Sequence, residues 1–224
     1  MDKIEEMTNH DKVDVRQCEH IQYAQDVEKT LSQLESQLHN SDNPEEIIMN
    51  TLVAAAEFYD GDWAGIMDAD LTMKIWSTLF WYNRRTKSMS PNSFGDIEEG
   101  EFLWRWIDSL TRGTPMIIKD VEEIRLLSPL EYEFLKSNGV RSMVAVPFWK
   151  RPTGFLIVRN PKRYITRSSL LQMMAFVAVS SINEKRLMDS TERQHIYPST
   201  VRLSVGTENI NDLIDALQEA FEYV

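Results

Sequence analysis

Two apolar runs joined by a short turn constrain the fold of this chain more than any other part of its sequence. Residues 142–149 read Ser-Met-Val-Ala-Val-Pro-Phe-Trp, and residues 153–160 read Thr-Gly-Phe-Leu-Ile-Val-Arg-Asn. Runs of this length are typical of strands, and the first is apolar enough for a central strand. Because only the turn Lys150-Arg151-Pro152 separates them, we expect two consecutive strands, the first of them central in its sheet.

Apolar periodicity and turn residues place the other elements around this pair. Asn43 and Pro44 suit the N-cap and first position of one helix, and Ser128 with Glu131 forms a capping box for another. Residues 84–100 are rich in Gly, Pro, Ser and Asn and read as a long loop. We expect helices from 44 to about 59, at 102–110, 129–137 and 166–188, and strands at 63–68, 73–82 and 116–121.

This order of elements indicates an α+β fold. The strands follow one another as antiparallel neighbours, and the hairpin of 63–68 with 73–82 begins the series. We expect the helices to gather on one side of the sheet.

A helix precedes this domain. Residues 13–38 contain neither Gly nor Pro, and their apolar residues recur at alternating spacings of three and four. This apolar seam docks either on its own domain or on a second copy of the chain; it consists of Ala24, Val27, Leu31, Leu34 and Leu38. We therefore divide the chain into an N-terminal tail and signalling or dimerisation helix at 1–40, a sensor domain at 41–190 and a strand–helix tail at 191–224.

Charge and cysteine content exclude several classes of partner. The formal net charge is −11, so the chain repels nucleic-acid backbones and anionic membrane surfaces. Cys18 is the only cysteine, which excludes an internal disulfide and fits a reducing compartment. The first residues lack the apolar core of a signal peptide, and 170–182 is too short to span a bilayer. We expect a cytoplasmic protein.

The residues of common catalytic and metal sites are missing from the expected domain core. All four histidines lie outside it: His10, His20, His39 and His195. This argues against a clustered metal site and a Ser-His-Asp triad. Catalysis by carboxylates alone stays open, but Asp68, Asp70 and Asp120 fall at turns and strand ends. We expect no catalytic residue, no metal and no cofactor.

A set of aromatic residues is the best candidate for a ligand pocket. Trp76, Phe80 and Tyr82 alternate along one strand and should share a face. Trp104 and Trp106 lie on the short helix that we expect over that face. Arg141 and Lys119 are placed to orient an anionic group. The alternative is a packed core with surface salt bridges, and the candidate ligand residues are Trp76, Phe80, Tyr82, Trp104, Trp106, Asp120 and Arg141.

The domain resembles a GAF domain, a relative of the PAS fold, over residues 41–190. The resemblance rests on Thr-Pro-Met-Ile-Ile-Lys-Asp-Val at 114–121, Gly-Val-Arg-Ser-Met-Val-Ala-Val-Pro-Phe at 139–148, and Thr-Gly-Phe-Leu-Ile-Val at 153–158. It implies an antiparallel sheet of five or six strands with flanking helices. It also implies a small ligand or chromophore held between one sheet face and the segments 74–82, 102–124 and 126–148. In that family the end helices often pair across a dimer and signal to an output domain.

The sequence departs from the GAF members with known specific activities. It lacks the Asn-Lys-Phe-Asp-Glu signature of those that bind cyclic nucleotides, and the expected domain has no cysteine to attach a bilin or to reduce methionine sulfoxide. The resemblance therefore implies a sensor module with an unknown small-molecule ligand, a homodimer and an output domain or partner protein. The alternative is a structural dimerisation module with a vestigial pocket.

The C-terminal tail has a different resemblance. Residues 199–221 read as a strand, a Gly turn and an amphipathic helix, and they resemble the end of PLP-dependent enzymes of cysteine and methionine metabolism, such as O-acetylhomoserine sulfhydrylase. In that family the arginine at the position of Arg202 holds the substrate carboxylate. The Schiff-base lysine and the cofactor domain have no counterpart upstream, so we interpret the tail as a fusion or frame remnant. The alternative is a functional link to such a sulfhydrylase.

Overall fold

The computed structural model describes residues 9–70, 75–90, 97–98, 103–148 and 153–193. It divides into two compact units, Met1–Arg186 and Leu187–Val224, and the domain discussed below is the first of them. The predicted strand and helix of 199–221 lie outside the described residues. The helices are α1 (Asn9–Asn40), α2 (Pro44–Phe58), α3 (Trp104–Arg112), the 3-10 turn η2 (Val121–Ile124), α4 (Pro129–Ser137) and α5 (Ser169–Arg193).

An antiparallel sheet forms the middle of the domain. Its path runs β3-β2-β1-β7-β6-β5, and β4 pairs with β2 beside this path. The expected apolar pair is confirmed, since β6 and β7 are neighbours near the centre and all of their residues are buried. The strands are β1 (Trp63–Asp70), β2 (Ile75–Asn83), β3 (Ser88–Ser90), β4 (Ile97–Glu98), β5 (Met116–Ile118), β6 (Met143–Phe148) and β7 (Gly154–Arg159).

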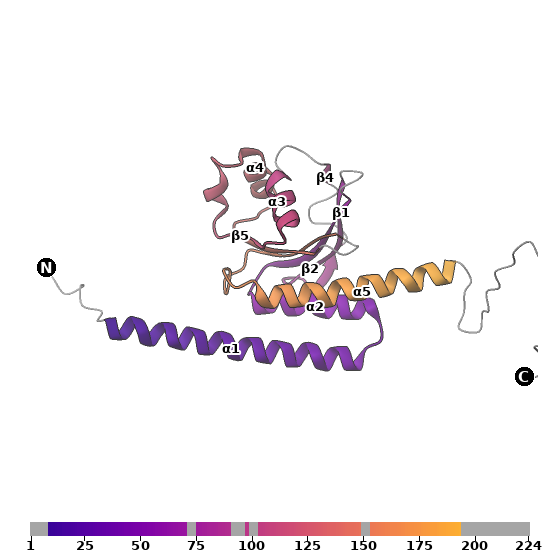
Figure 1. Ribbon diagram of the computed structural model, residues 1–224, viewed down its shortest axis with the longest axis horizontal. Coiled ribbons are helices and arrows are strands. Elements are labelled where there is room, and N and C mark those ends of the chain that lie inside the picture. The colour runs from indigo at the N-terminus through magenta and orange to yellow at the C-terminus, as the bar shows by residue number, and fades with distance from the viewer. Residues whose placement is uncertain (1–8, 71–74, 91–96, 99–102, 149–152, 194–224) are drawn as a thin grey trace, which may run out of the picture. The chain divides into compact units, whose positions relative to one another are not determined.

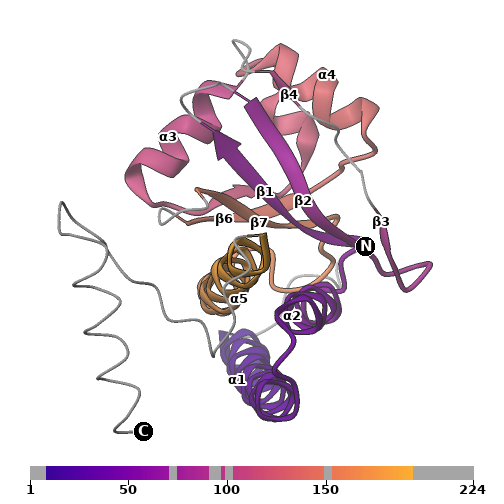
Figure 2. The ribbon, with the colours of Figure 1, turned by 90° about the vertical axis from the view of Figure 1, so that its right-hand side faces the viewer.

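Helices cover both faces of this sheet. α2 and α5 lie along one face, with α1 on their outer side, whereas α3 and α4 lie over the other face (Figures 1 and 2). The expectation that the helices gather on one side is therefore wrong. The physical reason is that β6 and β7 are apolar on both faces, and an apolar sheet face must be covered by other elements.

Local sequence signals account for most element boundaries. The Asn43 side chain accepts the backbone N–H of Glu45 at 3.0 Å, so Asn43 is the N-cap of α2 as predicted. Residues 84–100 are not all loop, because they contain the short strands β3 and β4, which both pair with β2. Such short edge segments carry too few residues for an apolar alternation to be visible in the sequence.

Helix α1 docks on its own domain through part of its apolar seam. Leu34 is buried, and Val27 and Leu31 pack against the core that α2 and α5 share with the sheet. The Asp26 carboxylate accepts the Tyr164 hydroxyl at 2.7 Å and so ties α1 to the segment before α5. Of the two partners that the sequence left open, these seam residues therefore use their own domain.

Candidate ligand-binding site

Three aromatic rings meet under α3. Trp76 of β2 stacks on Phe155 of β7 with ring centroids 6.0 Å apart. Trp106 of α3 lies edge-on to both rings, with centroids 6.2 Å from Trp76 and 5.4 Å from Phe155. All three side chains are buried. The structure thus brings together two of the predicted residues, Trp76 and Trp106, and adds Phe155, whose sequence context indicates only an apolar strand.

A β-bulge divides the predicted aromatic strand face. Ile66 of β1 pairs with Phe80, but the next residue, Met67, pairs with Thr78, so Leu79 is the extra residue. Phe80 and Tyr82 therefore pack in the core beneath α1, α2 and α5, whereas Trp76 faces α3. The prediction that Trp76, Phe80 and Tyr82 share one face is wrong, because one extra residue reverses the alternation of a strand.

Helix geometry separates the two tryptophans of α3. Residues two apart on a helix point in nearly opposite directions, at about 200°. Trp106 accordingly faces the sheet, while Trp104 is 51% exposed. Only Trp106 joins the aromatic rings.

A buried carboxylate lies beside these rings. Glu131 of α4 is fully buried, and its side chain accepts Trp106 Nε1–H at 3.1 Å and Arg105 Nη1–H at 3.0 Å. Burial raises the pKa of the Glu131 carboxyl above its usual value, while Arg105 acts in the opposite direction. The site therefore combines aromatic walls with an ion pair between the buried Glu131 and the partly buried Arg105, which joins α3 to α4. We call Glu131, Arg105 and Trp106 the Glu131 triad.

This carboxylate corrects the interpretation of Ser128 and Glu131 as a capping box. A capping-box glutamate turns back toward the N-cap N–H at the helix surface. Here the Ser128 side chain makes no cap hydrogen bond, and Glu131 points inward to α3. The spacing of Ser128 and Glu131 does not distinguish a surface cap from a buried acceptor. The donors to Glu131 come from α3, more than 20 residues earlier in the chain.

The charged residues of the prediction lie elsewhere. Asp120 caps η2, since its carboxylate accepts the Glu122 N–H at 3.0 Å. Arg141 is exposed and pairs with Asp62 at 3.2 Å. Lys119 is exposed as well. None of these three residues belongs to the two buried side-chain clusters of the sheet.

Comparison with known proteins identifies the fold. No protein-family model and no curated protein matches this chain. Among solved structures, the phycoerythrobilin-bound GAF domain of a cyanobacterial phytochrome is 16% identical, with a TM-score of 0.54 over 73% of this chain and 97% of that one. The GAF domain of a phosphoenolpyruvate-protein phosphotransferase from Coxiella burnetii is 15% identical, with a TM-score of 0.53 over 75% and 98%. The chain has a GAF-like fold.

A third similar structure supports the same conclusion. It is a biliverdin-bound, far-red absorbing protein in its dark state, 13% identical, with a TM-score of 0.57 over 69% of this chain and 98% of that one. The resemblance that the sequence showed at residues 41–190 is therefore confirmed for the fold, and identities this low carry the fold alone.

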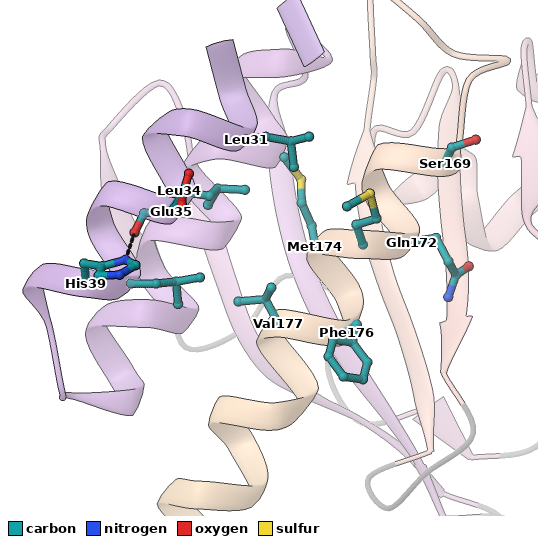
Figure 3. A pocket seen from close by; sticks show the side chains of 11 residues that line it. Leu31, Leu34, Glu35, His39, Ser169, Gln172, Met174, Phe176 and Val177 are labelled. Carbon is teal, nitrogen blue, oxygen red and sulfur yellow. Dashed lines mark hydrogen bonds between the residues drawn. The ribbon is translucent and has the colours of Figure 1, made fainter. Parts of the chain in front are cut away.

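The opposite side of the GAF-like domain carries an apolar groove. It lies between α1 and α5, has a volume of about 630 Å³, and is open at the surface (Figure 3). Phe176 is 71% exposed and Met173 is 54% exposed, which is unusual for such large apolar side chains. We call this surface the α1–α5 groove; its lining includes Leu31, Leu34, Leu38, Met173, Phe176 and Val177.

Two further features bear on the chemistry of the domain. Among the residues that the structure describes, no group of three or more His, Cys, Asp or Glu side chains is placed to hold a metal ion. In the same part of the chain, no helix is long and apolar enough to cross a membrane.

Proposed function

We propose that the chain is an intracellular regulatory module that binds a small molecule on the α3–α4 face and signals through its terminal helices. The observation that carries this proposal is the Glu131 triad beside the aromatic rings. A buried ion pair adds little to stability compared with apolar residues of the same volume, because both charges lose their hydration. A carboxylate held among aromatic walls instead suits the recognition of a ligand with a polar group.

Ligand binding at this place requires α3 to move. Trp76, Trp106 and Phe155 are in contact with one another, so a ligand that stacks on them must displace Trp106. The ion pair between Glu131 and Arg105 connects α3 to α4, and Glu131 would exchange Arg105 for the ligand. A flat ligand with a hydrogen-bond donor or a positive charge fits these groups best.

A thermal-shift screen of metabolites tests the binding proposal. A ligand at 100 times its Kd should stabilise the protein by about 2.7 kcal/mol and raise Tm accordingly. Glu131→Gln removes the negative charge that would accept the ligand's donor or cation, so we expect weaker binding in this variant. Trp104→Ala, at an exposed position on α3, should bind as the wild type does. Equal loss in both variants would contradict this location of the site.

For the output we propose a homodimer in which two copies pair through their α1–α5 grooves. A large exposed apolar surface is commonly an interaction site, and a two-fold arrangement buries the same residues of both copies. Phe176→Glu should therefore give a monomer in analytical ultracentrifugation, whereas Leu126→Glu should leave the dimer intact. Leu126 is 95% exposed and lies after η2, on the other face of the sheet. A wild-type monomer at tens of micromolar would contradict the dimer.

A second candidate is a structural dimerisation module without a ligand. The close contact of the three aromatic rings favours it, since a filled core needs no ligand to be stable. It predicts a stable dimer and an unchanged Tm throughout the metabolite screen.

We propose no enzymatic activity and interpret residues 191–224 as a fusion remnant; a purified protein with the yellow colour of bound PLP would contradict this interpretation.

A further inference from the structure

One end of the sheet gathers positive charge. Trp63 pairs with Asn83 on one side and with Arg159 on the other, and Arg159 pairs with Met143. The loops that follow β2 and β7 and those that precede β1 and β6 therefore meet at this end. They carry the cations Arg84, Arg85, Lys87, Arg141, Lys162 and Arg163, in a chain whose net charge is −11.

The carboxylates at this end are already paired. Asp60 pairs with Arg84 and lies 3.7 Å from Lys162. Asp62 accepts Arg141 at 3.2 Å and the Asn160 amide at 2.9 Å. Arg163 pairs with Asp26 of α1 at 3.3 Å.

Arg85 differs from these residues. It is exposed, and no carboxylate among the described residues pairs with it. The Asn83 side chain accepts its backbone N–H at 2.9 Å, which fixes the turn that carries it. The backbone that carries Arg85 is thus fixed by this turn, and its exposed guanidinium lies beside the hollow described next.

A hollow of about 610 Å³ lies between Arg85 and the start of β1. Trp63 forms one wall, and it is held by the Trp81 ring at 6.3 Å and by the Arg159 guanidinium 5.7 Å from its ring centre. An indole fixed in this way offers a rigid flat surface. We call this the β1–β2 hollow; its lining is Gly61, Asp62, Trp63, Asn83, Arg84 and Arg85.

The loops at this end of the sheet contain residues in the left-handed backbone region. Among the described residues other than glycine, those with positive φ are Asp60 at 48°, Lys87 at 52°, Asn160 at 52° and Tyr164 at 55°. All four lie in the loops at this end of the sheet. Asp60 and Asn160 are of the types that adopt this region readily, whereas Lys87 and Tyr164 are less usual there.

We propose that the β1–β2 hollow binds a small organic anion that carries a flat ring. The ring stacks on Trp63, and the anionic group, a phosphate or a carboxylate, is bound by Arg85 with support from Arg84. The negative charge of the whole chain does not prevent this, because charges farther than about 8 Å are screened at physiological salt. The hollow is separate from the Glu131 triad and needs no movement of α3.

Fluorine NMR of protein labelled with 5-fluorotryptophan tests the proposal. Phenyl phosphate and benzoate are the two probes, and they separate the phosphate from the carboxylate form of the anion. The Trp63 resonance, assigned with Trp63→Phe, should shift saturably with at least one probe. Benzyl alcohol, which has the ring without the charge, should bind at least tenfold more weakly.

Charge-reversal variants give the matched control. Arg85→Glu should weaken probe binding at least tenfold, whereas Arg112→Glu, an equally exposed change on α3, should alter it less than twofold. Arg85→Gln repeats the test without reversing the charge and should also weaken binding. The proposal is overturned if Trp63 shows no saturable shift, if the two glutamate variants weaken binding equally, or if the probes shift Trp76 and Trp106 instead.

Discussion

Replacement of Gly154 by alanine is expected to destabilise the domain by about 3 kcal/mol or more. A Cβ atom at this position would lie 1.8 Å from the backbone oxygen of Met67 and 3.1 Å from the Cα of Asp68. These are main-chain atoms of β1, which pairs with β7 at this point, so no side-chain rotation relieves the clash. The two strands must separate at the centre of the sheet. Urea unfolding followed by circular dichroism measures the loss.

Gly113→Ala is the matched control for this substitution. Gly113 ends α3 with φ of 65°, and a Cβ there would meet nothing within 4 Å. Its cost is therefore only that of a left-handed alanine, about 1 kcal/mol. Equal losses at the two positions would contradict the close approach of β1 and β7.

Glu131→Leu should cost about 3 kcal/mol, since it leaves the partly buried guanidinium of Arg105 and the buried Trp106 N–H without this acceptor. Glu131→Gln should cost less, because the amide oxygen still accepts one of these donors. Glu133→Leu makes the same change at an exposed position of the same helix and should stay within about 0.5 kcal/mol. The measurement is again the free energy of unfolding in urea.

The wild type and Glu131→Gln should differ in how their free energy of unfolding depends on pH. Because the pKa of Glu131 is raised in the folded state, the folded protein holds this proton more tightly than the unfolded chain does. The stability of the wild type, relative to Glu131→Gln, should therefore fall as the pH rises above about 4.5. It should become constant once the buried carboxyl has ionised. A difference that grows with pH would show that the pKa is lowered instead.

Much of the fold follows from signals that are local in the sequence. The apolar runs of β6 and β7 and the cap at Asn43 each depend on residues that are close in the sequence. Such local patterns can be recognised without the structure. The candidate site depends on the partner strand and on distant helices. The bulge at Leu79 is visible only in the register with β1, and nothing in the sequence of β2 marks it.

The roles of Glu131 and Arg141 are also not visible in the sequence. Glu131 has the spacing of a surface cap, and only the position of α3 shows that it is buried. Arg141 is predicted to bind the ligand, but it lies just before the first residue of β6. That end of β6 pairs with the last residues of β7, away from Phe155 and the other aromatic rings. The residue type indicates that these side chains form ion pairs or hydrogen bonds. The fold determines which partner each of them contacts.

The bulge in β2 also has a mechanical consequence. Trp76 belongs to the core under α3, and Tyr82, six residues later on the same strand, belongs to the core under the long helices. One continuous backbone segment thus connects the two layers covalently. We expect a displacement of the indole by a bound molecule to act on Tyr82 only through β2, whose pairing with β1, β3 and β4 it would also disturb.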